Sequence, residues 1–199
     1  MGTIHFIRHG DTEASGDGVF CGDLDIPLAA SGVAQAEALA PKIVSFGVRA
    51  IYVSSKLRAR MTAEPVCRAM GLTPRVEDGL KEILYGRWDG RHESEIRASE
   101  PRAYAEWTSD PGTMSPPGGE SGYTIAARAM PVVARIAEAH TDEQVVVFSH
   151  KATIRIITCV LLGVPVSRFR DRIACPTASI TSFTFGPHGP MLERLGETA

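Results

Sequence analysis

Short apolar runs alternate along the chain with longer segments in which apolar residues recur every three or four positions. The short runs are rich in β-branched and aromatic residues, which favours strands, and the longer segments favour amphipathic helices. Strands are predicted at residues 3–8, 50–55, 144–150 and 180–185, with weaker candidates at 73–76 and 191–195. Helices are predicted after residue 31 and at residues 58–70, 121–140 and 152–162.

The segment QVVVFSH, Gln144–His150, is the plainest strand of the chain. An unbroken apolar run of this length predicts burial on both faces, as in a parallel sheet. Strand and helix signals also alternate, which is typical of helices covering both faces of one sheet. The predicted fold is therefore α/β, a three-layer αβα sandwich around a mostly parallel central sheet.

Two predicted helices carry signals that bear on their bounds. Ser31 is the expected N-cap of the first helix. Pro41 lies within the same pattern and predicts either a kink or a later start. Gly163 is expected to end the helix that follows the strand at residues 144–150.

Residues 85–121 differ from the rest of the chain. They contain both tryptophans, many charges and the run DPGTMSPPGGES, with helical patches and no strand signal. Insertions of this kind often form lids or binding walls. The expected organisation is one domain over residues 1–199, with a cap insertion over the active site at about residues 85–121.

Composition narrows the classes of partner. The chain has 199 residues, a formal net charge of -2 and 44% hydrophobic residues, with both signs of charge interleaved. Without a basic surplus, neither nucleic acid nor a membrane surface is an expected partner. No apolar run reaches the length that spans a bilayer, so a cytoplasmic protein is expected. The four cysteines show no CxxC pair, and a disulfide framework is not expected.

Two predicted strands end at a histidine: IHFIRHG at His9 and VVVFSH at His150. Ligands of open α/β sheets bind beyond the carboxyl ends of the strands, so neighbouring strands would bring both imidazoles to one pocket. Arg8 stands beside the first histidine, and Arg58 opens the helix after a third strand. Such a cationic cluster is costly unless an anion occupies it, and a phosphate ester fits two guanidinium forks.

Phosphate binding alone does not require two histidines. One imidazole could attack phosphorus as a covalent nucleophile, with the other cationic groups stabilising the transferring group. The leaving oxygen then needs a proton from a carboxylic acid. Glu82, in LKEILYGRWDG, is the best candidate by position, with Asp11 and Asp89 as alternatives. His5 lies in mid-strand and is read as a core residue, and no metal site is expected.

Six motifs follow one another in order over residues 4 to about 185: RHGDT, GDLDIPLAASGVAQA, SSKLRARMTA, KEILYGRWDG, PPGGES and VVVFSHKATIR. In this order they resemble the histidine phosphatase superfamily, the phosphoglycerate-mutase-like proteins, and its branch of small phosphatases. The resemblance implies that His9 becomes phosphorylated during turnover and that Arg8, Arg58 and His150 complete the phosphate pocket. It also implies that Glu82 donates the proton and that no metal or other cofactor takes part.

The resemblance extends to the substrate side of the site, where this chain differs from the family's usual sequence at some positions. Cys21 and Gly22 match a loop that lines it. The tryptophan-asparagine pair that commonly follows the first motif is absent, and Ser15 is the candidate to replace the asparagine. After His150 the family often has two glycines, whereas this chain has Lys151 and Ala152, which could place a positive charge near a substrate phosphate or carboxylate.

The predicted function is hydrolysis of a small phosphorylated metabolite through a phosphohistidine. A mutase that returns the phosphoryl group to a second hydroxyl is the first alternative. It is disfavoured because mutases of this family usually carry longer insertions. A non-catalytic protein that binds a phosphorylated ligand is the second, and it predicts loss of a catalytic group. The partner expected is a small phosphate ester, and the apolar C-terminal strands could form the edge of a homodimer.

Overall fold

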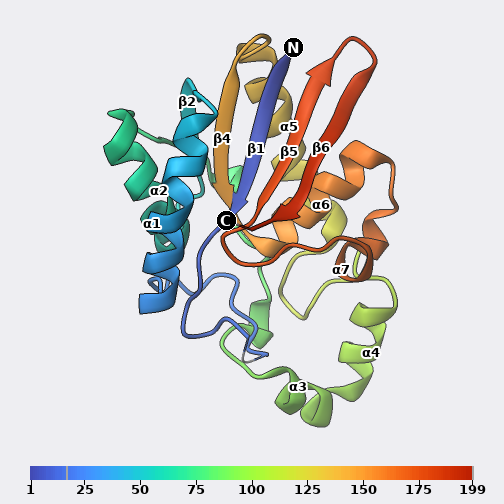
Figure 1. The fold of residues 1–199 in the computed structure, drawn as a ribbon. Coiled ribbons are helices and arrows are strands. Elements are labelled where there is room, and N and C mark those ends of the chain that lie inside the picture. The colour runs from blue at the N-terminus through green and yellow to red at the C-terminus, as the bar shows by residue number, and fades with distance from the viewer. Residues whose placement is uncertain (17, 199) are drawn as a thin grey trace.

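The computed structural model describes residues 1–16 and 18–198, and within them one six-stranded sheet forms the centre of the molecule (Figure 1). The strands lie in the order β3-β2-β4-β1-β5-β6. Their bounds are β1 Gly2–Arg8, β2 Ala50–Val53, β3 Arg75–Val76, β4 Gln144–Ser149, β5 Ile180–Gly186 and β6 Gly189–Glu197.

Parallel pairing joins the strands on which the candidate site depends. β1 pairs with β4, β4 with β2 and β2 with β3, all in parallel, whereas β5 and β6 add antiparallel strands at the other edge. In the β1–β4 register Arg8 stands opposite Ser149. The residues that follow the two strands therefore emerge side by side at the same end of the sheet. The predicted mostly parallel α/β sandwich is confirmed.

Helices cover both faces of the sheet and one of its ends (Figure 1). The α-helices are α1 Ala30–Ser45, α2 Leu57–Met70, α3 Glu93–Ser99, α4 Pro101–Ser109, α5 Gly122–Ala139, α6 Lys151–Leu162 and α7 Phe169–Arg172. Short 3-10 helices are η1 Asp78–Leu80, η2 Gly86–Trp88 and η3 Val166–Arg168. Helices α1 and α2 pack on one face and α5 and α6 on the other.

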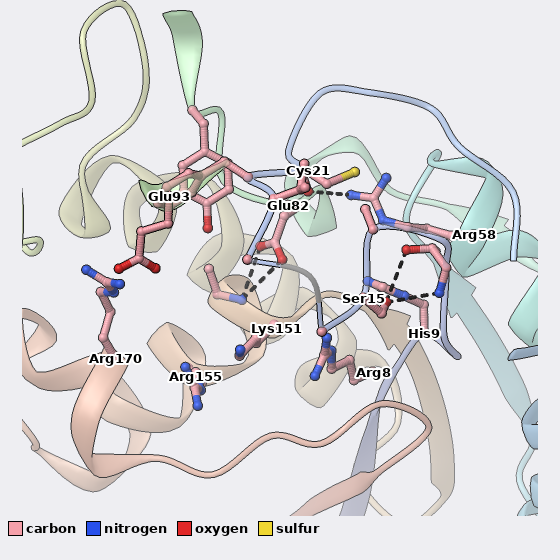
Figure 2. Close-up of a pocket in the computed structure, with 18 of the residues that line it drawn as sticks. Arg8, His9, Ser15, Cys21, Arg58, Glu82, Glu93, Lys151, Arg155 and Arg170 are labelled. Carbon is pink, nitrogen blue, oxygen red and sulfur yellow. Dashed lines mark hydrogen bonds between the residues drawn. The ribbon is translucent and has the colours of Figure 1, made fainter. Parts of the chain in front are cut away.

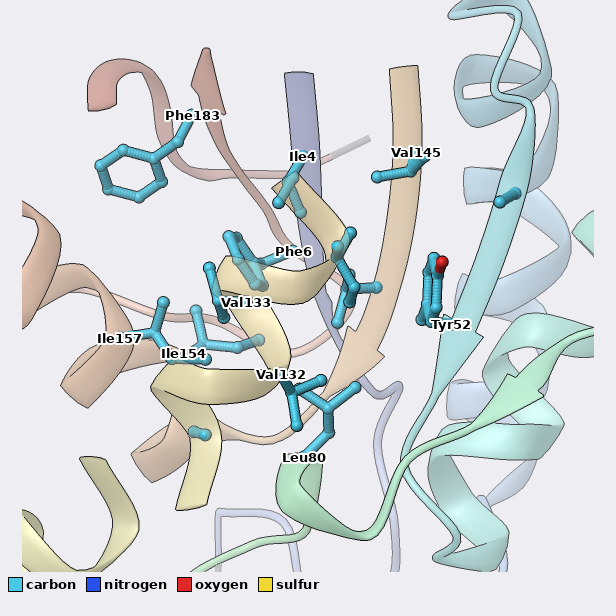
Figure 3. Packing of buried hydrophobic residues seen from close by; sticks show 14 of the residues in the cluster. Ile4, Phe6, Tyr52, Leu80, Val132, Val133, Val145, Ile154, Ile157 and Phe183 are labelled. Carbon is cyan, nitrogen blue, oxygen red and sulfur yellow. The ribbon is translucent and has the colours of Figure 1, made fainter. Parts of the chain in front are cut away.

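Alternation along β1 divides the core between these two faces. Ile4 and Phe6 pack in the cluster that includes α5 and α6 (Figure 3), and Ile7 packs in the cluster with α1 and α2. Successive strand side chains point to opposite faces, which gives this division. His5 shares the α1 face, where its ring stacks on Phe46 and its nitrogens bond Ser182 and Gln144. It is a core residue, as predicted.

The element bounds differ from the sequence predictions at several ends. Helix α1 begins at Ala30, so Ser31 lies inside the first turn and the predicted N-cap is wrong. Pro41 neither delays nor ends this helix, which continues to Ser45. Strand β3 is only two residues long, and β6 extends beyond its predicted range at both ends. The closing glycine of α6, Gly163, has φ 67° and confirms the prediction there.

Residues 85–121 fold into η2, α3, α4 and connecting loops. Figure 1 shows α3 and α4 beyond the carboxyl ends of β1 and β4. Trp88 and Trp107 are fully buried and form a separate apolar cluster with Phe20 and Ile96. This segment therefore has its own small core, which holds it over the end of the sheet where the candidate site lies.

Among the described residues, no helix combines the length and apolar character needed to cross a bilayer.

Candidate active site

His9 and His150 come together at the carboxyl end of the sheet. Each follows the last residue of its strand, and β1 and β4 are neighbours in the parallel register. The centroids of the two rings lie 5.2 Å apart. Both side chains are buried, His150 completely. Adjacent strands thus deliver two imidazoles from distant parts of the sequence to one place, as the sequence predicted.

The hydrogen bonds of His9 fix which ring nitrogen is free. Its Nδ1 lies 2.8 Å from the carbonyl oxygen of Gly10. A carbonyl can only accept, so Nδ1 carries the proton and Nε2 keeps its lone pair in the neutral ring. Gly10 itself is packed against α1: a Cβ there would lie 2.6 Å from the carbonyl oxygen of Gly32. The glycine therefore permits close approach to a helix, and the loop that orients His9 is held firmly.

The surroundings of His9 keep its ring neutral. Burial lowers the pKa of His9 well below its ordinary value of 6.5, and Arg58 and Arg8 lower it further. Both causes act in the same direction because a buried imidazolium loses its hydration and is repelled by nearby guanidiniums. At neutral pH, Nε2 is therefore available as a nucleophile.

This electrostatic state predicts the titration of His9. In the free protein, nitrogen-detected NMR should show His9 as the Nδ1–H tautomer, without protonation as the pH falls from about 8 to about 6. Saturating inorganic phosphate should raise the pKa of His9, because a neighbouring anion favours the imidazolium. A His9→Gln variant assigns the signal. Titration at or above the ordinary value in the phosphate-free protein would contradict the proposed environment.

His150 is held in place by one of its two nitrogens. Nε2 lies 2.8 Å from Oγ of Ser54, a residue that follows β2. Nδ1 is buried and has no hydrogen-bond partner in the described part of the chain. Burial lowers the pKa of His150 well below its ordinary value, with Arg58 and His9 adding to it. A buried, unpaired ring nitrogen beside His9 is a place where a phosphate oxygen would complete the hydrogen bonding.

Arg58 is aimed by the loop that precedes α1. Its guanidinium donates to the carbonyl oxygens of Leu24 at 2.8 Å and Gly22 at 3.1 Å. Arg8 donates from Nη1 to the carbonyl of Cys175 at 2.7 Å, and its Nε is buried without a partner. Neither arginine makes an ion pair with a described carboxylate. Backbone carbonyls thus fix both guanidiniums and leave their positive charges for a ligand.

Glu82 lies at the start of α6. Its Oε1 accepts from the backbone N–H of Ile83 at 3.0 Å and of Ala152 at 3.1 Å, and Oε2 has only a longer contact of 3.3 Å to Ala152. The two alternative carboxylates are occupied elsewhere: Asp89 accepts from Gly22 and Leu24, and Asp11 accepts from a side-chain amide. Of these three, only Glu82 lines the central cavity.

A cavity of ≈ 440 Å³ unites these groups. Figure 2 shows His9, Arg58 and Ser15 toward one end, with Glu82 and Lys151 nearer the middle. Ser15 and Cys21 also belong to the wall. Gly22 and His150 do not line the cavity: Gly22 acts through its carbonyl contact with Arg58, and His150 lies behind the wall beside His9.

Sequence reasoning missed several polar residues of this region, among them Glu93, which also lines the cavity. Ser54 orients His150, and Arg155 and Arg170 line the cavity at its far end. Arg155 could have been found, because it lies four residues after Lys151 and shares its face of the same helix. No sequence pattern placed Arg170 at the cavity, because α7 is one turn long and the orientation of so short a helix depends on packing.

The structure also bears on disulfide bonds and metal binding. All four cysteines are free. Within residues 1–16 and 18–198, no group of three or more His, Cys, Asp or Glu side chains is arranged to hold a metal ion. His5 lies within β1 and His9 follows its last residue, and the two rings make separate contacts.

A family model described as the histidine phosphatase superfamily (branch 1) matches residues 4–198. Two of the relatives with more than 30% identity illustrate the match. The Phosphoserine phosphatase 1 of Hydrogenobacter thermophilus is 31% identical over 90% of this chain and 84% of its own. The Glucosyl-3-phosphoglycerate phosphatase of Mycobacterium tuberculosis is 33% identical over 82% of this chain and 76% of its own.

Solved structures share the whole arrangement. The Bacillus stearothermophilus protein YhfR superposes with a TM-score of 0.93 at 25% identity, covering 100% of this chain and 98% of its own. A mycobacterial glucosyl-3-phosphoglycerate phosphatase solved with VO3 gives a TM-score of 0.89 at 29% identity, covering 98% and 99%. The likeness thus extends over nearly the whole chain, residues 85–121 included.

Proposed function

The chain belongs to branch 1 of the histidine phosphatase superfamily, whose members act as hydrolases on small phosphorylated metabolites, and we propose that it works through a phosphohistidine formed on His9. The observation that carries this proposal is the state of His9. Its Nδ1–H is bonded to Gly10, and its Nε2 is unprotonated in a cavity that also contains Arg8 and Arg58.

In the first proposed step, Nε2 of His9 attacks the phosphorus atom of the ester. The N–P bond forms as the bond from phosphorus to the leaving oxygen breaks, and that oxygen takes a proton from the carboxylic acid of Glu82. Arg8 and Arg58, which line the cavity, stabilise the charge on the equatorial oxygens, and His150, held by Ser54, completes the pocket behind His9. Backbone carbonyls already hold both guanidiniums, so little reorganisation accompanies the reaction.

In the second proposed step, a water molecule attacks the phosphorus of phosphohistidine. The carboxylate of Glu82 takes a proton from this water, the N–P bond breaks, and inorganic phosphate leaves with the imidazole again neutral. Oε2 of Glu82 is the better placed atom for both transfers, since Oε1 already accepts two backbone bonds. One carboxyl group thus acts first as acid and then as base.

We further propose that residues 85–121 act as a cap over the site and that Ser15, Cys21 and Lys151 contact the substrate. All three line the cavity. The Oγ of Ser15 lies 3.0 Å from the backbone nitrogen of Thr12, which ties the loop after β1 into a turn at the phosphate end. The first substrates to test are phosphoserine and glucosyl-3-phosphoglycerate, after the names of two relatives.

The test is release of inorganic phosphate from p-nitrophenyl phosphate, phosphoserine and 3-phosphoglycerate. Turnover with free phosphate as the product is expected, and excess EDTA should change the rate by less than about twofold, because the proposed nucleophile and acid are protein side chains. Chromatography of the organic product separates hydrolysis from isomerisation. An isomerised phosphoglycerate would point to a mutase, and strong inhibition by EDTA that added metal reverses would contradict the proposed chemistry.

A further inference from the structure

The cavity continues past the phosphate end into a second group of cations. Lys151 and Arg155 lie one helical turn apart on α6 and both line the cavity. Arg170, from α7, lines it farther on, as Figure 2 shows. The row from Arg8 through Lys151 and Arg155 to Arg170 is longer than one phosphate group requires. We call these last three residues the distal cations.

The distal cations have no acidic partner within ion-pair distance among the described residues, although Arg168 next to Arg170 pairs with Asp171 at 2.7 Å. The Nε of Arg155 is buried and has no hydrogen-bond partner in the same residues. Arg170 is held by its guanidinium, whose central carbon lies 4.2 Å from the ring centroid of Trp107. None of the three charges is therefore neutralised by a carboxylate, and Arg170 is in addition held in place by Trp107.

Charge counting shows how much negative charge the cavity can take. Five cationic side chains line it, namely Arg8, Arg58, Lys151, Arg155 and Arg170. The lining carboxyl groups are Glu82 and Glu93, so the wall has a net charge of four when His9 is neutral and Glu82 is protonated for its role as acid. Since Oε1 of Glu93 accepts from the hydroxyl of Tyr104, that carboxylate is partly engaged. A bound phosphate ester supplies about -1.5 to -2, which leaves about two positive charges uncompensated.

The distal cations repel one another and also Arg8. Burial lowers the pKa of Arg8 and of Lys151, with repulsion from Arg155 adding to the first and repulsion from Arg8 adding to the second. The pKa of Arg155 is lowered by burial, and Arg170 adds to this by repulsion. An anion bound between the two distal arginines would relieve that repulsion without occupying the place of the reacting phosphate.

We propose that the distal cations, above all Arg155 and Arg170, form a carboxylate subsite, so that the preferred substrate is a phosphomonoester whose leaving group carries a carboxylate. The inference rests on the proposed function, since it places the reacting phosphate at His9. The uncompensated positive charge favours a second anion on the leaving group. The two guanidiniums match the planar oxygens of a carboxylate. Phe20, Tyr85 and Phe169 supply apolar wall for the carbon skeleton between the two anions.

Matched pairs of esters test this directly. 3-Phosphoglycerate and glycerol 3-phosphate differ by a carboxylate in place of a hydroxymethyl group, and phosphoserine and phosphoethanolamine differ by one carboxylate. p-Nitrophenyl phosphate serves as a substrate without a second anion. Steady-state kinetics on the wild-type protein should give a kcat/KM at least about tenfold higher for the carboxylated member of at least one pair, as expected for a charge-assisted hydrogen bond.

Variants of the subsite should remove that preference. Arg155→Gln and Arg170→Gln are expected to raise KM for the carboxylated ester about tenfold each, with kcat nearly unchanged, because the subsite binds ground state and transition state alike. Turnover of p-nitrophenyl phosphate should stay within about twofold. Arg168→Gln is the matched control, since Arg168 is exposed, pairs with Asp171 and does not line the cavity.

The outcomes separate this inference from the proposed function. Turnover of both members of each pair with equal kcat/KM would overturn the carboxylate subsite and leave the phosphatase chemistry standing. Equal losses in Arg155→Gln and Arg170→Gln on carboxylated and uncharged esters would do the same, because they would indicate a general effect on the site. Failure of the wild-type protein to release phosphate from any of the five esters would overturn both.

Discussion

Replacing His9 with alanine is expected to lower kcat by about 10⁴-fold or more and to abolish the phosphorylated form of the protein at the same time. Both effects have one cause, the loss of Nε2, the atom that would form the bond to phosphorus. The ring is oriented by Gly10 and kept neutral by burial beside Arg8 and Arg58, so no neighbouring side chain is equally prepared. Rapid mixing with p-nitrophenyl phosphate and an alkaline quench, followed by intact-protein mass spectrometry, measures the phosphoprotein.

Two controls make this result interpretable. His188→Ala removes an exposed histidine in the β5–β6 turn and should keep full activity. His9→Gln preserves much of the side-chain volume and should be as inactive as His9→Ala while unfolding at a temperature close to that of the wild type. Near-normal turnover by either His9 variant, or a phosphoprotein that persists in both, would rule out His9 as the nucleophile.

The pairing of His9 with His150 was predictable because two separate signals agree in the sequence. Each histidine ends an apolar run, and the valines before His150 indicate a strand buried on both faces, as in a parallel sheet. Parallel strands place their carboxyl ends at one edge, so two strand-end histidines meet if their strands are neighbours. The structure shows that β1 and β4 are neighbours and brings the rings to 5.2 Å.

Other parts of the site depend on contacts that a linear pattern does not contain. Ser54 reaches His150 only because β2 and β4 pair in a particular register. The guanidinium of Arg170, which lines the cavity, packs on Trp107, a residue of the 85–121 segment that lies more than sixty positions earlier in the chain. The residues at strand ends are therefore easier to predict than the residues that line the rest of the cavity. The latter come from loops and short helices, whose positions depend on tertiary contacts.

Ser31 and Pro41 show how packing overrides local preference. The hydroxyl of Ser31 would suit an N-cap, yet α1 begins one residue earlier, with Ala29 at the cap and no side-chain bond there. Pro41 lacks a backbone N–H, but the neighbouring residues Leu39, Ala40 and Ile43 are buried against the sheet. Burial of this apolar face holds the helix together despite the missing hydrogen bond.

Glu82→Gln is expected to separate the two chemical steps, because one carboxyl group serves both. Glutamine keeps the shape of glutamate and can still accept from Ile83 and Ala152, so the start of α6 should remain in place. It cannot donate a proton to an alkoxide or take one from water. For an alkyl ester such as glycerol 3-phosphate, kcat should therefore fall about 10²- to 10⁴-fold.

With p-nitrophenyl phosphate the same variant should behave differently, because nitrophenolate leaves without a proton. The first step should stay fast and the second should become slow. Stopped-flow absorbance is then expected to show a burst of nitrophenolate approaching one equivalent per protein, followed by slow turnover, with phosphohistidine accumulating. Asp89→Asn and Asp11→Asn are the controls. Neither should give a burst, since Asp89 accepts from a loop amide, Asp11 accepts from the side-chain amide of Gln35, and neither lines the cavity. Equal losses on alkyl and aryl esters without a burst would assign the proton transfer to another group.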